Sequence, residues 1–357
     1  MPSTPSKRQR AILAIPFLGL TLLCLQVMDI EKMVAHQEPF LRSRKIKWSN
    51  GSIPILSHFH YAEFLNELWR GTTVSFSPST LGYDVVSSWQ MFSFLNDLGS
   101  VYVVWLLESS RVGNAWTPAY FPTIFAFAGQ LLGLGSVAPL FYFLCFTFGP
   151  STSALIQLPL KKRLAPEHNV TLLPILLLLH TCEVFAAYLA PQPTTRHYWT
   201  WAWQMSPLWV GIANFVISKL IGTSPSLRAT TIKWLTSPKL PLSLMSIISA
   251  GVWVYMLVNC PYPLSTVFIP SSSAQSEFVP HMRRALQYDE IAVFGTSFLW
   301  LGYLFFDLHC AGLIRRGEWL VPVAALPIFT AFVGPGAAFA FGWYWRESKL
   351  QSKLAQE

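Results

Sequence analysis

The chain has 357 residues, of which 52% are hydrophobic and only 12% are charged, and its mean hydropathy is +0.41. Soluble domains carry about 25% charged residues, so this composition excludes an ordinary soluble protein. The net charge is +8. Its Lys and Arg residues gather in the termini and loops, which is typical of membrane flanks that face anionic headgroups, and no nucleic-acid partner is predicted.

Apolar stretches long enough to cross a lipid bilayer recur along the whole chain. A span needs about 20 mostly apolar residues. We predict about eight spans, near 11–29, 85–107, 121–148, 170–190, 205–222, 241–259, 290–312 and 320–345. The predicted fold class is therefore all-α, a polytopic transmembrane helical bundle that forms a single integral-membrane domain over residues 1–357. No internal repeat is predicted.

The first predicted span follows the basic run KRQR and is followed by Asp29, Glu31 and Lys32, without a small-residue cleavage site. We therefore interpret it as a retained signal anchor and not as a cleaved secretory signal. The five cysteines are scattered, with no CxxC pair and no metal-binding spacing. No redox role is predicted for them.

The longest polar segment, residues 30–84, lies between the first two predicted spans. Within it, Ile55, Phe59, Leu65 and Trp69 recur at helical spacing, which predicts an amphipathic helix that lies on the membrane or caps the bundle. The two histidines of this stretch, at 58 and 60, are too few to predict a metal site.

Eight spans would place both termini on one side of the membrane, together with the loops at 108–120, 191–204 and 260–289. The loops at 30–84, 149–169, 223–240 and 313–319 would then lie on the other side. Two glycosylation sequons, at Asn50 and Asn169, fall on that second side, which predicts a glycoprotein with this side in the lumen.

Ionisable side chains inside apolar spans are costly unless they are paired or face a cavity, so each one is a functional candidate. The candidate catalytic residues are five acids: Asp97, Glu108, Glu183, Asp289 and Glu290. The predicted topology brings all of them except Asp97 to a similar depth near one face. Structural interpretations stay open: a helix-end salt bridge from Glu108 to Arg111, N-terminal helix positions for Asp289 and Glu290, and a helix–helix bond for Asp97.

The loops on that face supply hydrogen-bond donors and aromatic rings. The candidate substrate-binding residues are Arg111, Asn114, Arg196, His197, Tyr198, Trp199, Trp203 and Tyr288. An acid cluster with aromatic walls suits proton-initiated cation chemistry, because a carboxylic acid protonates an epoxide or alkene and aromatic faces stabilise the carbocation. A water-poor pocket prevents early quenching of that cation. The Trp-rich stretch is also typical of an ordinary interfacial belt.

Three motifs carry a resemblance to a known family: LLESSRVGN after the second predicted span, CEVFAAYLAPQ in the fourth, and the acid pair in YDEIAVFGTSFLWLGYLFFDL of the seventh. With them the chain resembles the integral-membrane terpene cyclases of fungal meroterpenoid biosynthesis, in particular the group of the ascochlorin, ascofuranone and macrophorin pathways. The resemblance covers most of the chain after about residue 85, whereas the long loop at 30–84 departs from the shorter relatives. It implies two essential carboxylates, for which Glu108 and Asp289 or Glu290 are the matching residues.

The resemblance implies a terpene cyclase of isomerase or lyase type in secondary metabolism. Its substrate would be a small prenylated aromatic or epoxide molecule, cyclised by protonation of a farnesyl chain in a multi-pass protein of the endoplasmic reticulum. The sequence has no DDxxD or DxDD motif, so neither a metal nor a cofactor is expected. Two other functions stay open: a sterol or lipid double-bond isomerase that uses the same acids, and a membrane transporter or lipid-binding receptor, which repeated halves and broken helices would favour.

Overall fold

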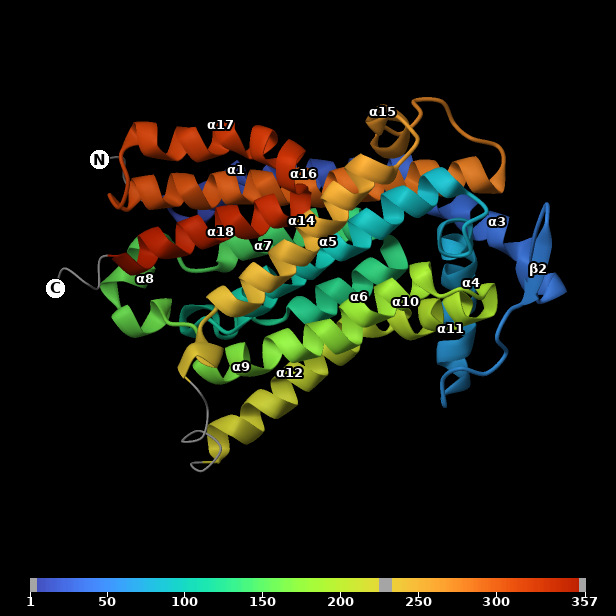
Figure 1. Ribbon diagram of the computed structural model, residues 1–357. Coiled ribbons are helices and arrows are strands. Elements are labelled where there is room, and N and C mark those ends of the chain that lie inside the picture. Colours follow the sequence, from blue (N-terminus) through green and yellow to red (C-terminus); the bar gives the residue numbers. More distant parts are fainter. Residues whose placement is uncertain (1–4, 225–232, 353–357) are drawn as a thin grey trace.

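The structure, a computed structural model, describes residues 5–224 and 233–352 as a bundle of helices with one small sheet (Figure 1). The α-helices are α1 (Lys7–Leu13), α2 (Ile15–Met28), α3 (Ile30–Ser43), α4 (Glu63–Thr80), α5 (Val85–Ser109), α6 (Pro122–Leu132), α7 (Leu134–Phe148), α8 (Thr152–Gln157), α9 (Pro166–Leu176), α10 (Cys182–Leu189), α11 (Pro193–Gln204), α12 (Ser206–Thr223), α14 (Lys239–Asn259), α15 (Leu264–Phe268), α16 (Phe278–Cys310), α17 (Arg316–Val333) and α18 (Pro335–Ser352). Four 3₁₀ turns, η1 (Val112–Asn114), η2 (Pro118–Tyr120), η3 (Pro159–Lys162) and η5 (Lys233–Thr236), and a π-helical turn, η4 (Leu177–Thr181), complete the helical part. Strands β1 (Lys45–Trp48) and β2 (Gly51–Pro54) form an antiparallel hairpin. The predicted helical class is confirmed.

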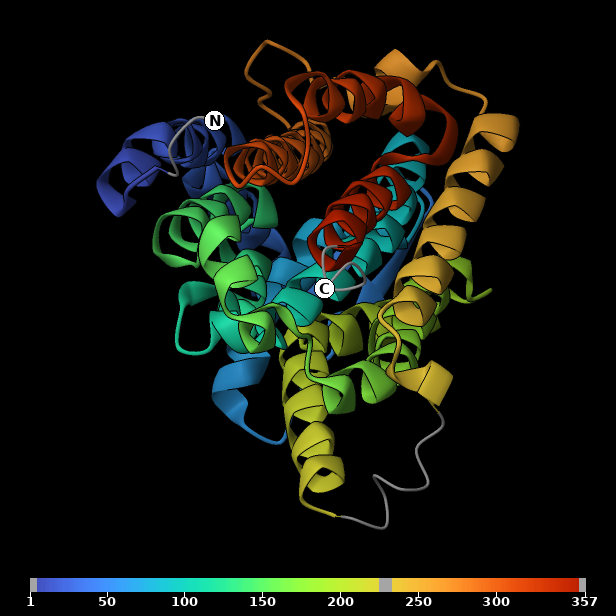
Figure 2. The same ribbon diagram turned by 90° about the vertical axis from the view of Figure 1, so that its left-hand side faces the viewer.

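The bundle has two ends, which we name by what lies at each. The terminal end carries both chain termini and the end of α18 (left in Figure 1). The cap end carries the β1–β2 hairpin with α3, α4 and α11 beside it (right in Figure 1). Seen from the terminal end, α18 lies in the middle of the bundle, with α5, α14 and α16 around it (Figure 2).

Four segments of the described chain are long and apolar enough to cross a membrane: Lys7–Ser43, Pro166–Leu189, Lys239–Asn259 and Phe278–Cys310. The pair α11 and α12, bent by 52°, adds a fifth if it is one span. These helices are compatible with a membrane protein. The eight predicted spans are thus supported only in part, and two of them, 121–148 and 320–345, are each divided into two helices that fold back on one another.

The predicted span at 121–148 is a hairpin of two short helices, α6 and α7. The break is at Gly133, whose φ of +79° suits a residue without a Cβ atom. With 11 and 15 residues, the two helices are about 16 and 22 Å long, which is less than the roughly 30 Å of a bilayer core. The rings of Phe125 and Phe141 lie 4.8 Å apart, so the helices pack side by side. The chain thus enters the bundle from the terminal end and returns to it.

The predicted span at 320–345 has the same construction. Its break is at Gly334, with φ +81°, and the rings of Phe329 in α17 and Phe341 in α18 lie 5.0 Å apart. Both hairpin tips are Gly-x-Gly, with Gly135 or Gly336 as the second glycine. The fold thus contains two helical hairpins with a similar tip, although no internal sequence repeat was predicted.

The first hairpin reverses the direction of the spans that follow it, and the predicted topology is wrong for this reason. Helices α5 and α16, expected to be antiparallel, run in the same direction: Asp84 pairs with Arg283 at 2.5 Å, and Gln90 with Glu290 at 2.7 Å. Helix α10 runs the other way, since the hydroxyl groups of Tyr188, near its end, and Ser79 lie 3.0 Å apart. Glu108 consequently lies at the opposite end of the bundle from Asp84.

The amphipathic helix predicted in the first loop is present as α4, but it begins at Glu63 and extends to Thr80. Trp69 of α4 is completely buried in a small core with Ile46 of β1, Ile55 and Trp201 of α11. Ile55 contributes to this core from a non-helical segment. The helix therefore caps the bundle.

The hairpin of α6 and α7 gives a labelling prediction. We expect Ala115→Cys, before α6, and Gln157→Cys, after α7, to react with a membrane-impermeant maleimide from the same face, because both positions are exposed at the terminal end. The measurement is labelling of sealed microsomes in a background without native cysteines. Reaction from opposite faces would restore a single span at 121–148.

Candidate functional site

Glu108, at the end of α5, belongs to a buried group of charges that we call the terminal ion cluster: Glu108, Arg111, Arg346 and Glu347. Arg111 binds both oxygens of Glu108 at 3.0 Å and one oxygen of Glu347 at 2.6 Å. Arg346 donates to Glu108 at 3.1 Å. Two cations and two anions therefore neutralise one another, as buried charges require.

Neutral donors complete the contacts of this cluster. Trp343 and Asn114 donate to the Glu108 carboxylate at 2.8 and 2.9 Å, and Arg111 donates to the carbonyl of Lys162 at 2.7 Å. Burial alone would lower the pKa of Arg111, but the carboxylates of Glu108 and Glu347 outweigh this effect and raise that pKa. The predicted pairing of Glu108 with Arg111 and Asn114 is confirmed, and the cluster joins α18 to α5.

An apolar cavity of about 260 Å³ lies towards the cap end, between α2, α3, α4, α5, the tip of the first hairpin, α11 and α16. Its volume is just below the roughly 300–1,000 Å³ of small-molecule sites. Its wall includes Met28, Met33, Gln37, Ser75, Phe76, Met91, Phe94, Leu95, Leu98, Tyr102, Gln130, Gly133, Leu134, Trp203, Met282, Leu286 and Asp289. Apolar and aromatic side chains with few polar groups are typical of a site that binds an apolar molecule.

Asp289 contributes a buried carboxyl group to this wall. Its Oδ1 accepts a hydrogen bond of 2.5 Å from the amide of Gly135, in the first turn of α7. This amide is one of the free N–H groups that begin every helix. A Cβ atom on Gly135 would lie 2.6 Å from the Asp289 carbonyl oxygen, so only glycine permits this close approach of α7 and α16.

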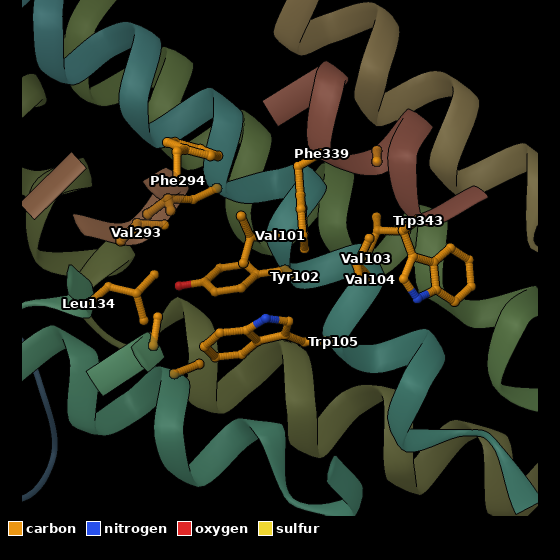
Figure 3. Close-up of a cluster of buried hydrophobic side chains, with 14 of the residues drawn as sticks. Val101, Tyr102, Val103, Val104, Trp105, Leu134, Val293, Phe294, Phe339 and Trp343 are labelled. Carbon is orange, nitrogen blue, oxygen red and sulfur yellow. The ribbon is translucent and has the colours of Figure 1, made fainter. Parts of the chain in front are cut away.

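Tyr102 faces the same region from α5. Figure 3 shows its hydroxyl group directed towards Leu134 and Val293, with the indole of Trp105 below the ring. Leu134 begins α7 and lines the cavity. Tyr102 thus carries a polar group to the apolar wall near the hairpin tip.

Asp97 holds the second hairpin tip as Asp289 holds the first. Its Oδ1 accepts hydrogen bonds from the Ser249 hydroxyl group and from the amide of Gly336, the latter at 3.3 Å. Asp97 is completely buried and is not in the cavity wall. The structural alternative predicted for Asp97, a hydrogen bond to a neighbouring helix, therefore agrees with its observed contacts.

The other two candidate acids lie on different helices, Glu290 on α16 and Glu183 on α10. Glu290 accepts a hydrogen bond of 2.7 Å from Gln90, and Glu183 is buried on α10, where Oε2 has no hydrogen-bond partner among the described residues. The predicted grouping of Glu108, Glu183, Asp289 and Glu290 near one face is wrong. Glu108 lies at the terminal end, whereas the hairpin at 121–148 reverses the spans that follow it, so that Glu290 lies towards the cap end beside Gln90, near the start of α5.

The predicted binding residues all lie in the described part of the chain, and Trp203 is the one of them that lines the cavity. His197 accepts from the amide of Leu56 at 3.4 Å and from Trp201 at 3.2 Å, and Arg196 donates to the carbonyl of Ala190 at 2.6 Å. These two side chains hold the cap together.

The remaining predicted binding residues lie near the surface. Tyr198 is half exposed and packs on Phe59 and Trp199. Tyr288 packs under the guanidinium group of Arg284, 4.9 Å from its ring centroid. Tyr198 and Trp199 lie outside the cavity wall because α11 lines it with Trp203, and Tyr288 of α16 is also outside it.

The two sequons do not share one side. Asn50 is exposed in the β1–β2 turn at the cap end. Asn169 is 2% exposed and donates to the carbonyl of Thr236 at 2.8 Å. The side chain of Asn169 is therefore not accessible in the folded protein, and glycosylation predicted there is inconsistent with the structure.

Several functional candidates were missed by the sequence interpretation: Tyr102, Gly135, Gly336, Arg346 and Glu347. The Gly-x-Gly pairs inside two apolar stretches were the available signal for the breaks. The partners of the hairpin tips had no signal, since they lie more than 150 residues away in sequence. No group of three or more His, Cys, Asp or Glu side chains within 5–224 and 233–352 is placed to hold a metal ion.

Fold and cavity together define a class: a helical bundle compatible with a membrane, whose interior suits a small apolar molecule. The chain belongs to the CtvD domain family, which matches residues 49–350. It is 31% identical to the FAD-dependent monooxygenase verC1 of Penicillium polonicum, over 98% of this chain and 43% of that protein. It is 26% identical to the FAD-dependent monooxygenase anuJ of Penicillium roqueforti (strain FM164), over 96% of this chain and 41% of that protein.

Terpene cyclase ascI of Acremonium egyptiacum is 25% identical over 51% of this chain and 48% of that protein. The chain therefore spans less than half the length of the two monooxygenases. The named relatives are enzymes. No solved structure matches this chain.

The close approach at the first hairpin tip can be tested by stability. Gly135→Ala should destabilise the protein by about 1–3 kcal/mol, the usual cost of overpacking. The matched control is Gly295→Ala in α16, where a Cβ atom would meet nothing within 4 Å and should be neutral or slightly stabilising. Thermal unfolding in detergent measures both, and equal melting temperatures would contradict the tip geometry.

The terminal ion cluster gives a second stability prediction. Arg111→Gln should cost about 3–5 kcal/mol, because it leaves a buried carboxylate without its partner. Arg42→Gln removes a cation from an exposed pair with Glu38 and should cost at most about 1 kcal/mol. The readout is again the unfolding temperature; a similar small effect of both changes would mean that the cluster is not buried as described.

Proposed function

We propose that the protein is a membrane-bound cyclase that protonates a prenyl chain, at a terminal epoxide or alkene, and closes a ring on a meroterpenoid precursor. The observation that carries the proposal is Asp289, a buried carboxyl group in the wall of an apolar and aromatic cavity. The assignment of the acid moves from Glu108 to Asp289, because both oxygens of Glu108 are already bound by cations and donors.

In the proposed reaction the Asp289 carboxyl group gives its proton to the epoxide oxygen as the C–O bond breaks. The electrons of a chain double bond then form the new C–C bond to the cationic carbon. The last cation loses a proton that returns to the Asp289 carboxylate and restores the acid, so substrate and product are isomers. The rings of Phe76, Phe94, Tyr102 and Trp203 line the cavity and can stabilise cations at their faces. Apolar walls exclude the water that would end the reaction early.

The named relatives support a substrate of this class. One is a terpene cyclase and two are FAD-dependent monooxygenases, of which this chain matches less than half. Dinucleotides bind to parallel α/β sheets in a common fold, whereas the described residues contain one antiparallel hairpin. We therefore assign the flavin chemistry of those relatives to their remaining length. A family shared by cyclase and monooxygenases fits a substrate that already carries an inserted oxygen, such as an epoxide.

The same proposal includes a single integral-membrane domain in the endoplasmic reticulum, with several membrane spans, and a reaction without metal or cofactor. A double-bond isomerase would use the same acid and cavity, and only the product separates it from a cyclase: a new ring or a displaced double bond.

A second candidate function, a transporter or lipid-binding receptor, is favoured by one observation. Two helical hairpins broken at glycine meet carboxyl groups inside the bundle, and broken helices near the middle of the membrane are typical of transporter binding sites. Conversion of substrate by isolated microsomes distinguishes the two, because a transporter leaves its ligand unchanged.

The test of the cyclase uses microsomes with an epoxyfarnesyl phenol in the presence of EDTA, and mass spectrometry of the products. Asp289→Asn keeps the size of the side chain but cannot donate an acid proton, so turnover should fall by on the order of 10²–10⁴-fold. The matched control is Glu38→Gln, an acid exposed on α3, which should keep normal turnover.

Three outcomes would contradict this proposal in different ways. Normal turnover by Asp289→Asn at normal expression would remove Asp289 and leave Glu290, Asp97 or Glu183 as the acid. Loss of activity with EDTA would exclude the metal-free reaction. No conversion by the unmodified protein would favour the transporter or receptor.

A further inference from the structure

His180 is completely buried, and three of its contacts belong to the cavity wall. Its Nε2 lies 2.9 Å from the carbonyl oxygen of Leu95, and the indole N–H of Trp203 donates to its Nδ1 at 3.3 Å. Its ring meets the ring of Tyr102 edge to face, with the centroids 5.1 Å apart. Leu95, Tyr102 and Trp203 all line the cavity, so His180 forms a layer directly behind it.

These contacts fix one neutral form of the imidazole. A carbonyl oxygen only accepts, so Nε2 must carry the hydrogen, and Nδ1 must then be the acceptor for the indole. Both nitrogens are used, and neither is free to act on a substrate. His180 can therefore influence the cavity only through the side chains that it holds.

The backbone at His180 is unusual for this chain. The π-helical turn Leu177–Thr181 separates α9 from α10. It is the one π-helical element in the described part of the chain. Such turns occur frequently at functional sites, because the additional residue changes the direction of the side chains. Here the turn places His180 between α5 and α11, where it can contact both.

We propose that His180 is a positioning residue that orients the indole of Trp203 and the phenol ring of Tyr102 towards the substrate chain. Trp203 in turn meets Phe76, another wall residue, edge to face at 5.3 Å. An aromatic ring steers a cation only from a fixed position over it, and a displacement of about 1 Å can cost up to ~10²-fold in rate. This inference rests on the proposed cyclase function, in which His180 determines which product the cation forms.

The test compares two variants of His180 with a histidine in the same segment. His180→Phe keeps an aromatic ring but removes both hydrogen bonds, whereas His180→Gln keeps a donor and an acceptor. The control is His168→Phe in α9: His168 also joins this segment to α12, through Asn214 at 3.1 Å and Ser218 at 3.3 Å, but it is outside the cavity wall. Folding of each variant is checked by its unfolding temperature.

One readout is the ratio of cyclised to water-trapped products from the epoxyfarnesyl phenol. His180→Phe should shift this ratio towards trapped products by about tenfold, with the ratio largely restored in His180→Gln and normal in His168→Phe. An unchanged ratio in His180→Phe would overturn the proposal. An equal shift in His168→Phe would also overturn it, since the effect would then be one of general stability.

A second readout needs no reaction: the binding of farnesyl phenol without the epoxide to the purified protein in nanodiscs. If the unmodified protein converts no epoxide, the cyclase function is contradicted. If His180→Phe then binds farnesyl phenol more weakly than His168→Phe, the positioning role of His180 is still supported. Equal binding by both variants would overturn the positioning role even if Asp289→Asn abolishes turnover. The two proposals can thus fail separately.

Discussion

The free amide groups at the tips of the two re-entrant hairpins must find acceptors inside the bundle. A helix always begins with N–H groups that have no partner within it, and in an apolar interior each unsatisfied group is costly. Asp289 accepts from Gly135 at one tip, and Asp97 accepts from Gly336 at the other. The buried acids of this chain are therefore first of all the partners of broken helices, and the positions of α5 and α16 depend on them.

The two acids differ in what lies beside them. Asp97 is enclosed by Ser249 and the second tip, whereas Asp289 also faces an apolar cavity. The same hydrogen bond that completes a hairpin can thus orient a carboxyl group towards a bound molecule. The terminal ion cluster lies at the other end, where it attaches α18 to α5. Glu108 is therefore occupied by charge pairing, whereas Asp289 holds a hairpin tip and also supplies the acid of the proposed reaction.

The cavity also connects the family relationship with the fold. Its wall draws on α2 and α3 as well as on helices within residues 49–350, the range that matches the CtvD domain family. Relatives named as a monooxygenase and as a terpene cyclase match nearly all or part of this chain. The range that this family matches therefore includes most of the cavity wall, and in the proposed function Asp289 supplies the acid there.

Composition by itself determined the helical, membrane-compatible class, because no soluble core needs so many apolar residues. Local spacing also determined the pair of Glu108 and Arg111, one helical turn apart. Only the tertiary structure decided which acids meet. Hydropathy measures how apolar 121–148 is, but not whether a glycine at positive φ turns the chain back within it. That single turn reverses the spans that follow, separates Glu108 from Asp289, and brings Gly135 to a carboxyl group 154 residues away.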